Sequence, residues 1–139
     1  MSPQLEARKR YLSNTSATVS PGQLVVMLYD GLMRDLAHAE QAMLNSSYDV
    51  AHEKLLNAQA IVMELFASLD RDKWEGGPGL AKLYLFLTTE LIDANVARDV
   101  TRVRACIALV EPLRDAWATA LAAMNTASTI TSVGMGSVA

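Results

Sequence analysis

The chain has 139 residues, which is enough for one domain with a substantial core but not for two full domains. About half of the residues (51%) are apolar, and the net charge of −3 argues against a general nucleic-acid-binding surface. The single cysteine, Cys106, excludes an intramolecular disulfide and a cysteine-based zinc site.

The sequence was searched for membrane-spanning and secretory segments. No stretch reaches the roughly 18 consecutive apolar residues that a membrane span requires. The N-terminal residues contain no apolar region of the kind found in secretory signals, so we expect a cytoplasmic protein.

The first long helix is predicted from Ser20 to Leu44. Ser20 suits the N-cap and Pro21 suits the first helical position. Six apolar positions repeat every three or four residues and should face the core: Val25, Leu28, Leu32, Leu36, Ala39 and Met43. The apolar run of this helix also extends beyond that stripe, to Val26 and Met33.

Two further helices follow, at about 48–69 and 78–97. The "DRDKWEGGPG" segment between them contains three glycines and a proline, which end a helix. Each helix again carries an inner apolar stripe, marked by Leu55, Val62 and Leu65 in the first and by Leu80, Tyr84, Leu87 and Leu91 in the second.

The fourth helix is predicted from about residue 100 to Met124. Its inner stripe keeps its phase across Pro112, so we expect a kink there rather than two helices. Cys106 lies on this stripe and is expected to be a core residue, not a nucleophile. Residues 125–139 are small, weakly apolar and uncharged, and we expect a disordered tail.

These four helices predict an all-α fold. Short connections favour antiparallel neighbours, and therefore an up-down-up-down four-helix bundle over residues 20–124. Residues 1–19 are expected to form a separate N-terminal segment and linker.

Apolar residues beyond the inner stripes are the unusual feature of the sequence. Leu56 and Met63 form an i, i+7 pair on the second helix, and Leu85, Ile92 and Val96 form a second stripe on the third. Isolated apolar residues are common on protein surfaces, but secondary stripes on three helices favour grooves that accept amphipathic helices from another chain. Pairing of these stripes in a self-associating structural bundle is an alternative.

Signatures of catalysis are sparse. Asp35 and His38 form a single Asp-x-x-His pair, whereas di-iron bundles use two such motifs, so we expect no metal site. His38 and His52 lack the glycine and lysine neighbours typical of histidine phosphotransfer bundles, which leaves that function, or another catalytic bundle, as an alternative. "GGPG" lacks the Lys-Ser/Thr of a phosphate-binding loop. We expect no enzyme activity and no cofactor.

Four segments resemble a known family. "SPGQLVVMLYDGLM", "NAQAIVMELFASLD", "LAKLYLFLTTELIDANVARD" and "LRDAW" occur in the order seen in FliS, the flagellar secretion chaperone family, and cover about residues 11–121. The resemblance implies a helical bundle, with a short N-terminal segment packing on it, that binds the carboxy-terminal segment of flagellin. It also implies that flagellin is held unpolymerised and delivered to the export gate.

The resemblance and the helical pattern together select a set of partner-binding residues. An export-gate membrane protein and other flagellar regulators are further partners to test, and we expect a monomer or a weak homodimer without membrane insertion. Tyr29 lies close enough to the inner stripe to be a core residue instead, and Asn95 could equally cap a helix end. The expected contact residues are Tyr11, Val26, Tyr29, Met33, Leu56, Met63, Leu85, Ile92, Asn95 and Val96.

Overall fold

The computed structural model describes residue 3, residues 19–70, residue 72 and residues 75–138, with side chains described as far as Ala127. This part of the chain forms helices and contains no strand. The helices are α2 (Pro21–Leu44), α3 (Tyr48–Ser68), α4 (Gly77–Ala97) and α5 (Val100–Val138). The predicted spans of the first three helices agree with these bounds to within one residue.

The start of α2 is set by local hydrogen bonds. The backbone N–H of Gln23 donates to the Ser20 hydroxyl (3.1 Å), and the backbone N–H of Ser20 donates to Oε1 of Gln23 (2.8 Å). This reciprocal capping box satisfies backbone donors that the first turn of a helix leaves unpaired. The N-cap role predicted for Ser20 is therefore confirmed.

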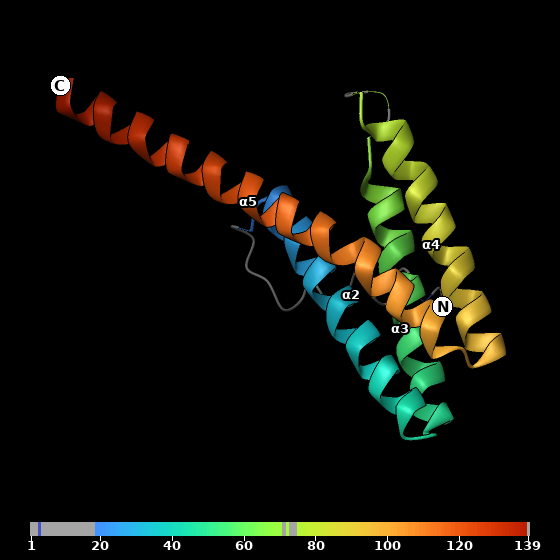
Figure 1. The fold of residues 1–139 in the computed structure, drawn as a ribbon. Helices are drawn as coiled ribbons and strands as arrows, with labels where there is room; N and C mark the ends of the chain where they lie inside the picture. The colour runs from blue at the N-terminus through green and yellow to red at the C-terminus, as the bar shows by residue number, and fades with distance from the viewer. Residues whose placement is uncertain (1–2, 4–18, 71, 73–74, 139) are drawn as a thin grey trace.

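The helices form a four-helix bundle in which each one packs against two neighbours. α2 and α4 both contact α3 and α5, so α2 and α4 occupy diagonally opposite positions (Figure 1). Two ion pairs show that α2 and α5 are antiparallel, because Asp30 near the start of α2 pairs with Arg114, whereas Glu40 near its end pairs with Arg104. The predicted bundle is confirmed.

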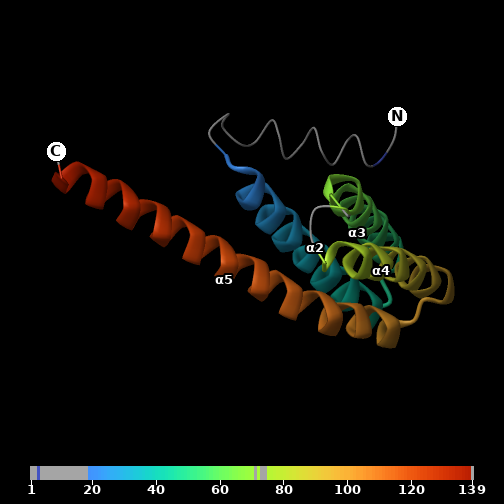
Figure 2. The same ribbon diagram turned by 90° about the horizontal axis from the view of Figure 1, so that it is seen from above.

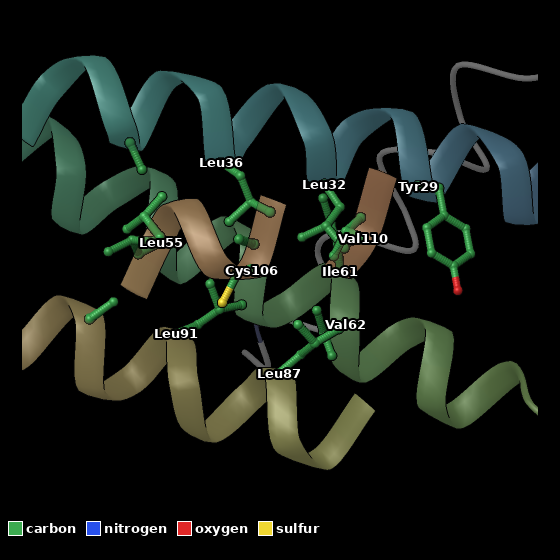
Figure 3. Close-up of a cluster of buried hydrophobic side chains, with 14 of the residues drawn as sticks. Tyr29, Leu32, Leu36, Leu55, Ile61, Val62, Leu87, Leu91, Cys106 and Val110 are labelled. Atoms are coloured by element: carbon green, nitrogen blue, oxygen red, sulfur yellow. The ribbon is translucent and has the colours of Figure 1, made fainter. Parts of the chain in front are cut away.

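The predicted inner stripes form most of the core, but the α5 stripe is buried only as far as Val110, and Met124 at its predicted end is 68% exposed. Side chains from all four helices point into one interior, including Leu32 and Leu36 of α2, Leu55 of α3, Leu91 of α4 and Cys106 of α5 (Figure 3). Cys106 is a buried core residue, as predicted. Val25 is the exception in the α2 stripe, because it is only partly buried against the core.

α5 continues without a break across Pro112. Proline lacks the N–H that would donate to the carbonyl of Ala108, one turn earlier. Both Pro112 and Ala108 are exposed, so water can bond to the carbonyl that the proline leaves unpaired. The structure thus confirms that Pro112 does not divide this segment into two helices.

The end of the last helix differs from the prediction. We expected the helix to stop near Met124 and a disordered tail to follow, but α5 continues to Val138. The alanine-rich segment before Met124 favours a helix and no proline after Pro112 interrupts it, whereas residues 125–138, with one alanine and two glycines, carry no comparable local signal. At 1.5 Å per residue, the 39-residue α5 is about 58 Å long, compared with about 36 Å for the 24-residue α2.

The C-terminal part of α5 projects beyond the bundle (Figures 1 and 2). It passes close to the first turn of α2, where a Cβ atom added at Gly22 would lie 3.1 Å from Cδ1 of Leu121. The absence of a side chain at Gly22 therefore permits this approach. None of the described helices has an apolar stretch long enough to span a lipid bilayer.

Candidate binding surface

Tyr29 belongs to the core and not to the surface. Its side chain is 0% exposed, and its hydroxyl lies 2.6 Å from the hydroxyl of Tyr84 on α4. Burial raises the pKa of both phenols above the ordinary value for tyrosine. The prediction that Tyr29 lies on a binding surface is therefore wrong. The alternative drawn from the sequence, that Tyr29 is a core residue, is correct.

Val26 and Met33 lie on the side of α2 that faces α5. Both are neighbours of Asp30 on the helix, four residues before it and three after it, and Asp30 pairs with Arg114 of α5 at 2.7 Å. Both side chains are half-buried, and Met33 packs against the core. Because α2 and α4 are diagonal, these two residues do not share one surface with the candidates on α4.

The remaining apolar candidates border the contact between α3 and α4. Leu56 of α3 and both Leu85 and Ile92 of α4 are exposed by 45%, 49% and 44%, and Val96 by 82%. The hydroxyl of Thr88, which lies between Leu85 and Ile92 along α4, contacts Sδ of Met63 at 3.8 Å. We call this surface the α3–α4 track, defined by Leu56, Met63, Leu85, Ile92 and Val96.

The track leads into a pocket of about 430 Å³ at the end of the bundle that carries the α2–α3 and α4–α5 turns. Val96 belongs to both the track and the pocket. Nδ2 of Asn95 lies 2.8 Å from Nδ1 of His52, which ties α4 to α3 at this point. We call this the loop-end pocket; its lining includes Tyr48, Asp49, His52, Asn95, Val96 and Arg98.

Two further observations concern the predicted set. Tyr11 lies outside the described residues. The sequence reasoning did not select Phe86, which is 50% exposed on α4. The sequence does mark Phe86 as a candidate for exposure, because it is a large apolar residue away from the inner stripe. It lies on the side of α4 that faces α5, since Glu90, four residues later, contacts Arg102 of α5.

The residues considered for catalysis do not form a reactive cluster. Asp35 is buried, whereas His38, one turn later on the same helix, is exposed. Burial and the nearby charge of Glu90 raise the pKa of the Cys106 thiol to about 11, which disfavours the thiolate. Within the described ranges, no three His, Cys, Asp or Glu side chains are placed to hold a metal ion.

Comparison with known proteins gives consistent results. A family model described as "Flagellar protein FliS" matches residues 4–124. The flagellar secretion chaperone FliS of Bacillus subtilis (strain 168) is 32% identical over 111 residues, which cover 80% of this chain and 83% of that protein.

Two other relatives carry the same name. The flagellar secretion chaperone FliS of Escherichia coli (strain K12) is 33% identical over 102 residues, or 72% of this chain and 75% of that protein. The one from Campylobacter jejuni is 30% identical over 112 residues, or 80% of this chain and 88% of that protein. The match spans the bundle, and the four-helix fold agrees with the resemblance seen in the sequence motifs. The chain therefore belongs to the FliS family of flagellar secretion chaperones.

Proposed function

We propose that this protein is a cytoplasmic export chaperone that binds the carboxy-terminal helical segment of flagellin on the α3–α4 track. In this role it keeps flagellin subunits from polymerising and assists their delivery to the flagellar export gate. The proposal includes a monomeric or weakly dimeric chaperone, no enzymatic turnover, and an export-gate membrane protein and other flagellar regulators as further partners.

The observation that carries the proposal is the line of exposed apolar side chains along α3 and α4. Amphipathic helices bind to other proteins by laying their apolar face into a groove of this kind. Exposed apolar residues arranged as a contiguous patch, unlike scattered single ones, are typical of interaction sites. The relatives are flagellar secretion chaperones, which supports a client that belongs to the flagellum.

The energetics favour the centre of the track as the main contact. Fully burying a leucine or isoleucine side chain contributes about 1.5–3 kcal/mol, and Leu85 and Ile92 are each roughly half-exposed before binding. Each should therefore contribute about 1 kcal/mol when a client helix covers it. A carboxylate at either position would lose that contribution and would in addition be desolvated without a partner.

The test replaces Leu85 and Ile92 together by aspartate in the full-length chain. Binding of the carboxy-terminal flagellin segment from the same organism is measured by isothermal titration calorimetry. We expect the dissociation constant to rise by more than about 100-fold, which corresponds to about 2.7 kcal/mol.

A matched control carries aspartate at Phe86 and Leu109, which are exposed by 50% and 39% but lie away from the track. The control should change the dissociation constant by less than about threefold. Helical circular dichroism should be unchanged in both variants, because all four positions are already solvent-accessible. Equal loss of binding in the two variants, or unchanged binding in the first, would contradict the assignment of the track.

A further inference from the structure

The loop-end pocket differs in chemistry from the track that leads to it. The track is lined by apolar side chains, whereas the pocket brings together the polar side chains of His52, Asn95, Arg98 and Asp49. Val96, the most exposed of the large apolar side chains in the track, also lines the pocket. A helix lying along the track would therefore place one of its ends in the pocket.

Asn95 and Arg98 supply hydrogen-bond donors to the pocket. The Asn95 amide uses one N–H toward His52, at 2.8 Å, which leaves its second N–H available. The guanidinium of Arg98 lies over the ring of Tyr48, 4.4 Å from its centroid. This stacking uses the face of the guanidinium, and the N–H groups along its edge remain free to donate.

Arg98 has no ion-pair partner among the described residues, in contrast to Arg102, Arg104 and Arg114, which all contact carboxylates. The first turn of α3 also borders the pocket, and Ser47 forms no side-chain cap on that helix. The backbone N–H groups of this first turn carry the positive end of the α3 dipole, whereas the last turns of α2 and α4, which also line the pocket, carry the negative ends of theirs. The group that favours a negatively charged acceptor in this pocket is therefore the Arg98 guanidinium.

Among the described residues of the lining, Asp49 is the one carboxylate, and it is exposed in the first turn of α3. It opposes an anionic ligand and should weaken its binding. Arg98 offsets the charge of Asp49, and the neutral N–H donors of Asn95 and His52 further favour a ligand with acceptor groups.

We propose that the loop-end pocket binds the terminal carboxylate of the client segment, with Arg98 as the main contact. The last carbonyls of a helix and its terminal carboxylate are the groups that need donors and positive charge. The client helix would then run parallel to α4, with its C-terminal end near Val96. This inference rests on the proposed function, because it assumes that the client lies on the α3–α4 track.

A double-mutant cycle tests the carboxylate contact. The client is a peptide with the carboxy-terminal sequence of flagellin from the same organism, made with either a free carboxylate or a carboxamide at its end. Each peptide is titrated into the full-length chain and into the Arg98→Gln variant. Amidation should weaken binding to the unmodified chain about fivefold, as expected for a partly exposed charge-assisted contact, and by less than twofold in Arg98→Gln.

Two further variants check the origin of the effect. Asp49→Asn should tighten binding of the free-carboxylate peptide about twofold, because it removes the opposing charge. Arg34→Gln, an exposed arginine on α2, should leave the effect of amidation unchanged. An equal effect of amidation in the unmodified and Arg98→Gln chains would overturn the proposal.

The direction of the client is measured separately by disulfide cross-linking. A client with a cysteine near its C-terminus should cross-link at least tenfold more to Val96→Cys than to Leu85→Cys. The native Cys106 does not compete, because it is buried. Preferential linkage to Leu85→Cys would overturn the proposed direction while leaving the track intact, whereas failure of the unmodified chain to bind either peptide would reject the track and the pocket together.

Discussion

The hydroxyl groups of Tyr29 and Tyr84 provide a direct test of how the bundle is held together. They lie 2.6 Å apart in the core and join α2 to α4, two helices that occupy diagonal positions and otherwise pack against α3 and α5. We predict that replacing either tyrosine by phenylalanine destabilises the fold, and that replacing both costs much less than the sum of the two.

The magnitude follows from burial. Both side chains are at least 98% buried, since Tyr29 is 0% and Tyr84 2% exposed, so a hydroxyl that loses its partner cannot turn to bulk water. Losing one net hydrogen bond costs about 1 kcal/mol, and leaving a buried polar group unsatisfied adds about 1–3 kcal/mol. Trp117 also hydrogen-bonds to Tyr29, which reduces the second penalty for Tyr84→Phe. We therefore expect Tyr84→Phe to lose about 2 kcal/mol and Tyr29→Phe, which removes the partner of both Tyr84 and Trp117, to lose about 3 kcal/mol.

The assay is urea unfolding followed by circular dichroism, with all four members of the cycle measured at pH 7. In the double variant both hydroxyls are gone, so no tyrosine hydroxyl is left buried without its partner. The coupling free energy between the two substitutions should therefore be about 1–2 kcal/mol. A coupling below about 0.5 kcal/mol would show that the two hydroxyls act independently and would refute the role assigned to this pair.

Other predictions concern alkaline pH and the two inter-helix turns. The pKa of Cys106 is raised to about 11, so between about pH 9 and 11 the unfolded chain releases a proton that the folded chain retains. The free energy of unfolding should therefore fall by about 1.4 kcal/mol per pH unit in that window. Urea unfolding at pH 8.5 and pH 10 should show a smaller loss of stability in Cys106→Ala than in the unmodified chain. Ser46 has a positive φ of 57°, so Ser46→Gly should raise the free energy of unfolding by about 0.5–1 kcal/mol in thermal or urea unfolding. Arg98 shares that backbone conformation (φ 52°) but stacks on Tyr48, so Arg98→Gly should stabilise less than Ser46→Gly does, and an equal gain would show that the stacking contributes nothing.

The sequence was sufficient for the helices because their determinants are local. Ser20 and Pro21 mark the start of α2, and the apolar spacing of three and four residues identifies the side of each helix that enters the core. The exposed residues Leu56, Leu85, Ile92 and Val96 were also predicted correctly to lie outside the core, since their angular distance from the inner stripe is large. Their contact with a client remains a prediction.

The sequence did not reveal where α5 ends or how the binding candidates are distributed. No proline follows Pro112 to interrupt the helix, so the end of the inner stripe near Met124 is not the end of α5. The loop-end pocket likewise depends on side chains that are far apart in the chain, as the contact between His52 and Asn95 illustrates.

Sequence alone therefore determined the class of fold, the bounds of three helices, the family resemblance and the angle of each side chain around its own helix axis. Only the tertiary structure decided that Tyr29 is enclosed, and that Val26 and Met33 face α5 while Leu85 and Ile92 border α3. The physical reason is that periodicity specifies a direction relative to one axis. Which neighbour lies in that direction depends on how the packed helices rotate and cross, and that is decided by the core as a whole.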